Sequence, residues 1–468
     1  MNDAAASHYS AEEQKLLGAR YRSLFVASMF AICCFNFADR AVFAVLAQSM
    51  KVDLELTDFQ LGLAQGVAFA GLYSLLGIPF GWLSERHNRI RIVAIATTIW
   101  SVSTVFCGTV QSFWQLMFAR SGVGLGEAGF VPATSSLVAD HFPSTRRASA
   151  MSIVMLGTPV GTFLGSVIAG WAADAWTWRT AFYVLGLPGL VCAVFIWLVL
   201  REPPRGLVDN VPKSPAPPPN LRAFWSQLIH RPAFRYVIIG GALAGFGMTS
   251  ISAFLAVFLA RVHHLPMREA GALYGTISGA SIAIGLVIGA FSSDWLAQRD
   301  RRWSAWIAML GLTIAPLVYF LAFRIEPRLP AAIVLTGAAA ILLLFYGPTL
   351  GMIQNLLEPK MRATGVSLFT TLYTAVGAGL GPTFVGFMSD RFTQSAFGAG
   401  NFKSTCPGGV APAGSPEALL HACANASASG VQNALTAAVC VFWLAAISYY
   451  MASRTLREDL YVAPVARA

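Results

Sequence analysis

Long apolar stretches with almost no charge are the feature that most constrains this chain. Residues 90–110, 181–200, 307–323 and 331–345 are four of them. Their lengths approach the ~20 residues that an α-helix needs to span a bilayer. In lipid every backbone N–H and C=O must find its partner within the protein, so such segments have to be helical. The sequence therefore predicts an all-α membrane protein.

The composition is compatible with many such spans, since 56% of the 468 residues are hydrophobic and only 12% are charged. We expect twelve transmembrane helices, near residues 23–49, 58–84, 90–110, 112–139, 146–174, 179–200, 234–260, 268–293, 303–323, 330–354, 361–390 and 430–452. Residues 201–220 interrupt the apolar pattern with seven prolines and read as a linker. We predict an N-terminal six-helix bundle over 1–200, a cytoplasmic linker with an amphipathic stretch over 201–233, and a C-terminal six-helix bundle over 234–468 with a long external loop at 391–429.

The two halves are related in sequence as well as in helix count. Adding 216 to positions in the fifth span gives the same residue in the eleventh, at Pro143/Pro359, Arg146/Arg362, Gly161/Gly377, Gly165/Gly381, Gly170/Gly386 and Asp174/Asp390. Internal repeats of this kind are typical of secondary transporters, which bind substrate where the repeats meet. Helix-boundary preferences shared by unrelated spans are the alternative explanation.

The basic residues behind the net charge of +10 are distributed as membrane topology predicts. Most of the 32 Lys and Arg residues fall in segments expected to be cytoplasmic, and only Arg40 and Arg120 lie within the membrane. This positive-inside asymmetry predicts that both termini are cytoplasmic, and it argues against nucleic-acid binding. We expect the chain to lie in the inner (plasma) membrane. Met1–Leu16 is polar and lacks the apolar core of a signal peptide, so we expect the first span to direct insertion.

Two of the seven cysteines, Cys406 and Cys423, share the predicted external loop. An oxidising compartment would permit a disulfide between them, and two free thiols are the alternative. The other five lie in spans, where we expect them to pack as small apolar residues. The histidines and acids show no metal-ligand spacing, so no metal is expected.

Four ionisable residues lie at membrane depth. Asp39 and Arg40 belong to the first span, and Arg120 and Glu127 belong to the fourth. Charge at this depth is costly and should face a protein interior or a watery cavity. Arg120 and Glu127 are seven residues apart, about 10 Å along one helical face. We expect Asp39 to pair with Arg120, with Glu127 deeper toward the cytoplasm.

These residues suggest proton coupling. Burial raises the pKa of a carboxyl group and a nearby arginine lowers it, so protonation depends on which side of the membrane admits water. Asp39 and Glu127 are therefore the candidate proton carriers, and the proton is the coupling ion expected in place of any cofactor. Arg40 and Arg120, always charged, are candidates for holding a substrate headgroup or the released carboxylate. A permanent buried salt bridge is the alternative.

One motif in the fourth span is misleading. Residues 124–129 match the GxGxxG dinucleotide fingerprint, which requires a preceding strand and a βαβ unit. Inside an apolar helix, small residues of this kind permit close helix packing. We reject a nucleotide site here, and the sequence contains no Walker motif.

A cluster of acids and bases follows the second span on the cytoplasmic side. Glu85, Arg86 and Arg89 belong to it, and they could form an ion-pair gate with Arg146 or Arg147 at the foot of the fifth span. The alternative is that these are loop charges that simply obey topology.

The second half carries almost no charge at membrane depth. The candidate cavity-lining residues are neutral or aromatic: Asn36 from the first half, then Tyr346, Gln354, Thr370 and Tyr373. A cavity that is charged on one side and apolar on the other suits an amphiphile better than a sugar.

These features resemble the major facilitator superfamily, and within it the Spinster branch in its bacterial form. The stretches that carry the resemblance are Asn36–Arg40, Gly81–Arg89, Arg120–Ala128, Ala139-Asp140 and Arg201–Gly206. Two departures are Ser84-Glu85, where the family commonly has Gly-Asp, and Ala38, where a bulkier residue or valine is usual. The resemblance implies proton-linked export or transfer of lysolipids or sphingoid phosphates, with the charges of the first and fourth spans in coupling and headgroup binding.

The leading hypothesis is a proton-coupled transporter, not an enzyme, that moves a lysophospholipid or sphingoid phosphate by alternating access. We expect it to work as a monomer among membrane lipids, without nucleic acid. A symporter of small organic anions or a multidrug exporter is the first alternative. A receptor or scaffold that no longer transports is the second.

Overall fold

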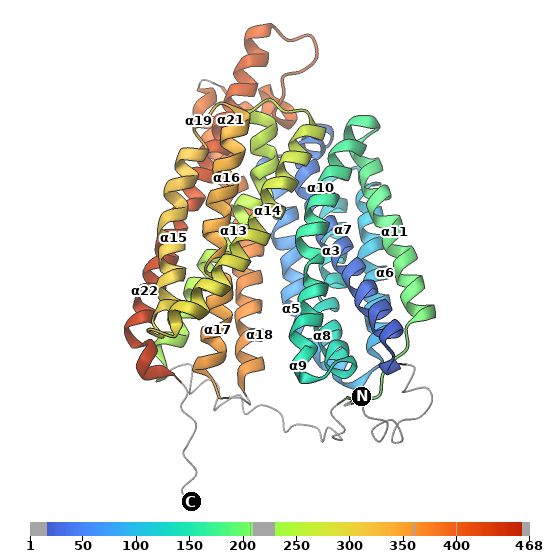
Figure 1. Cartoon of the computed structure of the whole chain (residues 1–468). Coiled ribbons are helices and arrows are strands. Elements are labelled where there is room, and N and C mark those ends of the chain that lie inside the picture. The colour runs from blue at the N-terminus through green and yellow to red at the C-terminus, as the bar shows by residue number, and fades with distance from the viewer. Residues whose placement is uncertain (1–15, 206, 209–229, 359–360, 399, 461–468) are drawn as a thin grey trace, which may run out of the picture. The chain divides into compact units, whose positions relative to one another are not determined.

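The structure is a computed structural model that describes residues 16–205, 207–208, 230–358, 361–398 and 400–460. Within these ranges the chain is helical and contains no β-strand (Figure 1). Eleven helices in the described part of the chain are long and apolar enough to cross a membrane. The expectation of an all-helical membrane protein is therefore confirmed. The predicted amphipathic stretch of the linker falls largely outside the described residues.

The chain divides into two compact units. The first comprises Met1–Phe43 and Gly71–Pro217, and the second comprises Ala44–Ala70 and Pro218–Ala468. The second half of the sequence thus forms one unit together with a short segment from the first two predicted spans.

The helices of the first unit are connected by short turns. They are the first part of α3 (Ala19–Asp53), most of α5 (Val67–Arg86), α6 (Arg89–Cys107), α7 (Phe113–Glu127), α8 (Phe130–His141), α9 (Ser144–Met155), α10 (Gly157–Ala175) and α11 (Trp178–Val199). Polar side chains begin several of them. Asn88, Ser112 and Thr177 each accept a hydrogen bond from the backbone three residues on, which satisfies an otherwise unpaired N–H of α6, α7 and α11.

The second unit contains the end of α3, α4 (Asp58–Gln65) and the helices that follow the linker. These are α13 (Pro232–Val262), α14 (Met267–Ala297), α15 (Trp303–Ala322), α16 (Arg328–Leu343), α17 (Tyr346–Leu356), α18 (Arg362–Leu372), the π-helical η2 (Tyr373–Leu380), α19 (Gly381–Phe397), the short α20 (Phe402–Thr405) and η3 (Pro407–Gly409), α21 (Glu417–Val439) and α22 (Val441–Asp459). Helix α15 packs against both α16 and α22 (Figure 1).

The predicted fourth span is not a single helix. Helix α7 ends at Glu127 and α8 begins at Phe130, with Ala128 and Gly129 between them. Neither part alone reaches the length of a membrane span, which is why this region is missing from the eleven. The break directly follows Glu127, one of the charged residues expected to be functional.

Helix α3 is continuous over 35 residues and contains neither glycine nor proline. Its residues up to Phe43 belong to the first unit, and its residues from Ala44 onward belong to the second. The second predicted span differs, because α4 ends at Gly66 and α5 begins at Val67.

Glycines of the predicted repeat occupy matching contacts in the two units. In the first unit a Cβ added at Gly161 would collide with the backbone of Cys34, and one added at Gly165 would lie 2.5 Å from the Cα of Ala38. In the second unit a Cβ at Gly377 would lie 2.9 Å from the backbone of Gly245. The repeat therefore preserves the close approach of α10 to α3 in the first unit and of η2 to α13 in the second.

The predicted external loop at 391–429 is largely helical. Helix α19 continues to Phe397, and α21 already begins at Glu417. Cys406, which lies between them, forms a disulfide with Cys423 of α21, and the two Cα atoms are 6.0 Å apart. The disulfide packs with Phe402 and Ala426 in a small apolar cluster of its own.

Candidate functional site

The charged centre of the first unit is an ion pair between Arg40 and Glu127. Arg40 Nε and Nη2 lie 2.7 and 2.6 Å from Glu127 Oε2. The Glu127 side chain is fully buried, whereas that of Arg40 is 34% exposed. Helix α3 supplies the base and the C-terminal residue of α7 supplies the acid, so the pair joins the two helices expected to carry the chemistry.

Asp39 lies beside this pair and is also buried, with 3% of its surface exposed. Its Oδ2 accepts a hydrogen bond of 3.0 Å from the Thr104 hydroxyl of α6. Among the described residues, neither Asp39 Oδ1 nor Glu127 Oε1 has a hydrogen-bond partner. Each carboxyl group therefore presents one oxygen, shielded from water, to which a proton could bind.

Arg120 does not form the ion pair expected with Asp39. Its guanidinium lies over the ring of Phe43, 4.4 Å from the centroid. Phe43 follows Asp39 by four residues, so it occupies the same face of α3 about one turn, ~5.4 Å, further along. Arg120 therefore lies one turn of α3 beyond Asp39. Glu127 of α7 pairs instead with Arg40, the residue next to Asp39. The distance along the helix axis was too coarse a guide to predict this pairing.

The neighbours of the pair are polar or aromatic. Asn36, predicted to line a cavity, is buried near the Glu127 carboxylate. The Arg40 guanidinium lies 5.1 Å from the ring centroid of Phe37 and 5.3 Å from that of Tyr73. Two aromatic rings therefore flank the Arg40 guanidinium, which places the positive charge and apolar surface side by side.

A second charged cluster lies at the N-terminal end of α6, where Arg89 is completely buried. Its guanidinium pairs with Asp140 of α8 and, at 2.6 Å, with Glu202. The other Glu202 oxygen accepts hydrogen bonds from the backbone of Arg89 and Ile90, at 2.8 and 3.1 Å. Glu202 thus forms an ion pair with the Arg89 side chain and also caps the N-terminal end of α6, where the helix dipole is positive.

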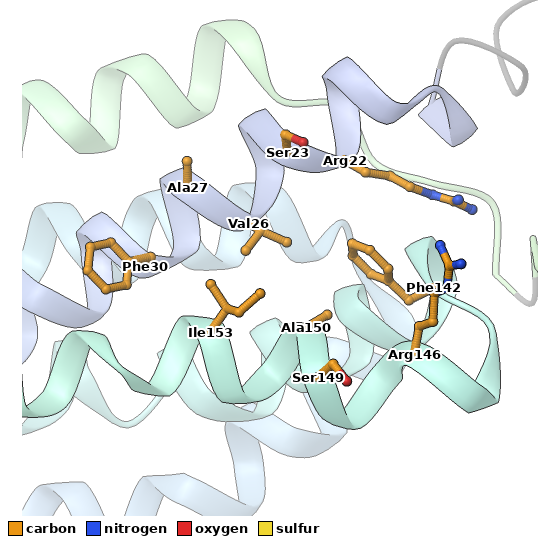
Figure 2. A pocket seen from close by; sticks show the side chains of 10 residues that line it. All are labelled: Arg22, Ser23, Val26, Ala27, Phe30, Phe142, Arg146, Ser149, Ala150 and Ile153. Carbon is orange, nitrogen blue, oxygen red and sulfur yellow. The ribbon is translucent and has the colours of Figure 1, made fainter. Parts of the chain in front are cut away.

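The structure describes other contacts for the remaining residues of the predicted cytoplasmic gate. Glu85 is exposed, and Arg86 stacks over Trp82, 4.0 Å from the ring centroid. Arg147 donates to the Phe142 carbonyl at 2.9 Å, and Arg146 is exposed and lines a pocket (Figure 2). Arg89 pairs with Asp140 and Glu202 instead of with another residue of the gate, and its pairing with Glu202, an acid just after the sixth apolar segment, was not predicted.

Replacing Glu202 with glutamine should destabilise the first unit. Arg89 would keep Asp140 but lose a charged hydrogen bond, and α6 would lose its anionic cap, so we expect a cost of about 1–3 kcal/mol. The melting temperature of the purified protein measures the effect. Glu85→Gln, at an exposed position on the same side, is the matched control. An equal loss in both variants would contradict the assignment.

In the second unit the predicted cavity residues are distributed unevenly. Tyr346 and Tyr373 belong to an aromatic cluster with Phe369, in which ring centroids are 5.7–6.3 Å apart. Gln354 and Thr370 are exposed, and the Thr370 hydroxyl bonds to the backbone of its own helix. The structure therefore brings together the two tyrosines of the predicted set.

A third charged cluster, which the sequence did not indicate, surrounds Asp58 in the second unit. Asp58 is fully buried at the start of α4. Arg261 holds both of its oxygens, at 2.7 and 2.8 Å, and Lys51 Nζ lies 2.8 Å from Oδ1. Ser389 donates a further hydrogen bond of 2.6 Å. This Asp58 cluster joins α3, α4, α13 and α19.

Asp390 and the disulfide segment complete this region. The Asp390 carboxylate accepts hydrogen bonds of 2.9 Å from the backbone of both Asp58 and Phe59, at the start of α4. Gly408 and Gly409, with positive φ, pack over the end of α3, where a Cβ at Gly409 would lie 3.3 Å from Lys51 Nζ. Of these residues only Asp390 was singled out from the sequence, as the repeat partner of Asp174.

The described residues contain no group of three or more His, Cys, Asp or Glu that could hold a metal. The chemistry that these clusters offer is the binding of protons and of charged groups. In the first unit, two acids and two bases surround the junction of α3, α6 and α7.

Residues 29–402 match the family model of the Major Facilitator Superfamily. The chain belongs to the Major Facilitator Superfamily. This superfamily member is 33% identical to an MFS-type efflux pump of Mycolicibacterium smegmatis over 360 residues, which cover 77% of this chain and 82% of the relative. It is 23% identical to the sphingosine-1-phosphate transporter SPNS2 of Danio rerio, over 77% of this chain and 74% of that one.

The solved structures place this superfamily member near the Spinster proteins. It superposes with a TM-score of 0.88 on the crystal structure of a bacterial homologue of the human lysosomal transporter Spinster in an inward-facing, unoccupied conformation. The two are 31% identical, with 96% of this chain and all of the other covered. The resemblance to Spinster is confirmed, and the chain is a transporter homologue rather than an enzyme.

Proposed function

We propose that this chain is a proton-coupled secondary transporter of an amphipathic, lipid-like substrate of the lysophospholipid or sphingoid phosphate class. The observation that carries the proposal is the Arg40–Glu127 pair with Asp39 beside it. Two buried carboxyl groups, each with one oxygen lacking a partner among the described residues, suit reversible proton binding. Arg40, bound to Glu127 yet 34% exposed, could exchange that partner for an anionic headgroup.

Proton binding and headgroup binding would then be linked through Arg40. While Glu127 is charged, Arg40 is bound to it and has less capacity for a phosphate. When Glu127 takes up a proton, the pair weakens and the guanidinium is released toward the substrate. The aromatic rings of Phe37 and Tyr73 would receive the apolar part adjoining the headgroup. A relative named for sphingosine-1-phosphate transport supports this substrate class.

The proposal includes a membrane arrangement. We infer twelve crossings in two six-helix bundles, with α7 and α8 together forming the crossing that is broken after Glu127. The transporter would lie in the inner (plasma) membrane as a monomer, with both termini cytoplasmic and the Cys406–Cys423 disulfide outside. Alternating access between the two bundles would expose the charged centre to one side at a time.

Transport of labelled lysophospholipid into liposomes that contain the purified protein tests the function. An imposed pH gradient should raise the initial rate, and a protonophore that collapses the gradient should remove the increase. Flux that depends on the protein but not on the gradient would contradict proton coupling. Absence of any lysolipid flux would contradict the substrate class.

A second candidate function is the export of small amphiphilic drugs, or the symport of small organic anions. The relationship to an MFS-type efflux pump favours the first of these. In the same liposomes, competition by a cationic drug or by short-chain carboxylates, with none by lysophospholipid, would favour this alternative over lipid transport.

A further inference from the structure

A short segment of the second unit, residues 401–409, approaches the end of α3 very closely. It contains α20 and η3, and we call it the cover segment. Gly408 and Gly409 have φ angles of +63° and +85°, which residues other than glycine rarely adopt. A Cβ at Gly408 would lie 3.0 Å from the Cα of Val52, and one at Gly409 would lie 3.2 Å from Lys51 Cε. Glycine therefore allows a contact here that a side chain would prevent.

The cover segment is fastened to α19 and α21. Gln394 of α19 accepts a hydrogen bond of 2.9 Å from the backbone N–H of Phe402. The disulfide joins Cys406 to Cys423 of α21, and these cysteines are only 1% and 0% exposed. A reductant in solution has no direct access to a bond buried in this way, so the fastening is permanent rather than a redox switch. From these two anchors the segment reaches across to α3.

The group under the cover segment is the ammonium of Lys51. Lysine side chains near the end of a helix ordinarily extend their charge into water. Lys51 lies in the last turn of α3 but is only 3% exposed, and its Nζ is 2.8 Å from Asp58 Oδ1. A Cβ at Gly409 would lie 3.3 Å from that Nζ. Asp58 and the cover segment thus both contact Lys51, and both contribute to its burial.

We propose that the cover segment is a lid that keeps water from the Lys51–Asp58 ion pair, and that it must lift before α3 and α4 can separate from α13 and α19. Charges attract strongly where water is excluded and much more weakly once water enters. The lid is fastened to α19 and α21, so it can release the end of α3 without losing its own anchors. The requirement for separation rests on the proposed alternating access, whereas the exclusion of water does not.

The rate at which Lys51 is acetylated by an N-hydroxysuccinimide ester tests the lid. The full-length protein in a non-ionic detergent is labelled for increasing times, and its peptides are quantified by mass spectrometry. Lys403, which is exposed on α20, is the internal reference and should react much faster than Lys51. Replacing both disulfide cysteines, in Cys406→Ala/Cys423→Ala, should accelerate labelling of Lys51 at least about tenfold, because the bond limits the open states of the segment.

A second pair of variants tests the contact with the disulfide left in place. Gly408→Ala puts a Cβ against the backbone of Val52 and should lift the lid, with labelling of Lys51 about fivefold faster or more. Gly414→Ala is the matched control. Gly414 has a φ of +84°, so alanine strains the backbone in the same way, but its Cβ would meet nothing within 4 Å. We expect Lys51 to stay protected in this control.

Three results would overturn the proposal. Lys51 reacting as fast as Lys403 in the unmodified protein would mean that the lid is not closed. Full protection of Lys51 in both the disulfide variant and Gly408→Ala would mean that the Asp58 cluster excludes water by itself. Equal acceleration in Gly408→Ala and Gly414→Ala would assign the effect to backbone strain. Labelling requires no flux, so the lid is tested separately from transport, and Gly408→Ala still tests it if the disulfide variant fails to fold.

Discussion

Asp39→Asn is expected to abolish the response of transport to a pH gradient while leaving the protein folded. Asparagine has nearly the shape of aspartate and can still accept the hydrogen bond from Thr104, but it cannot take up a proton. We expect the rate with the gradient to fall to the rate without it, because asparagine offers no group that binds a proton at this position. The measurement is lysophospholipid uptake into liposomes, with and without the gradient.

Glu127→Gln is the variant to compare with Asp39→Asn. It removes the second candidate proton site and also breaks the ion pair with Arg40, so both coupling and substrate affinity should change. Asp174→Asn alters an exposed acid of α10 and should leave the gradient response intact. If both Asp39→Asn and Glu127→Gln respond to the gradient as the unmodified protein does, the assignment of these residues to coupling is wrong.

Asp58→Ala is expected to cause the largest loss of stability. The substitution leaves Lys51 and Arg261, both buried, without the carboxylate that lies between them. Removing one partner of a buried ion pair typically costs about 3–5 kcal/mol, because the remaining charge is uncompensated. We expect a clear fall in the melting temperature of the purified protein and greater protease sensitivity around α4.

Two milder variants of the same cluster test the explanation. Asp390→Asn should cost only about 1 kcal/mol, since it weakens the cap of α4 and leaves the Asp58 pairs in place. Lys51→Met retains the two-oxygen contact between Arg261 and Asp58 and should also be tolerated better than Asp58→Ala. If Asp58→Ala proves no worse than Asp390→Asn, the buried charges do not stabilise this region as inferred.

The sequence predicted the membrane helices well because apolarity and span length depend on local composition. It also identified Asp39, Arg40, Arg120 and Glu127, since a charge inside an apolar segment is conspicuous. It did not predict their pairing. Axial position can be counted from the sequence, but contacts also depend on how each helix is rotated about its axis. Phe43 lies on the same face of α3 as Asp39 but one turn further along, so the contact with Arg120 depends also on how far the two helices are shifted along their axes.

The contacts of the Asp58 cluster could not be predicted from the sequence for a different reason. Asp58 lies at the boundary of a span, where an acid is ordinary, and its partner Arg261 is distant in sequence. The same holds for Glu202, which follows an apolar segment and gives no local sign of its contact with Arg89. Such pairs are fixed by tertiary packing. For Cys406 and Cys423, shared location allowed a disulfide, but the bond itself required the structure.

The unbroken course of α3 has a mechanical consequence. The helix passes from the first compact unit into the second between Phe43 and Ala44, only four residues after Asp39. Sharp bends in helices usually occur at proline or glycine, and α3 has neither, whereas the next span can flex at Gly66. Helix α3 therefore has no residue at which a sharp bend is expected, and it links the two units as one continuous helix. The point at which α3 passes from one unit to the other therefore lies within about a turn of Asp39 and Arg40.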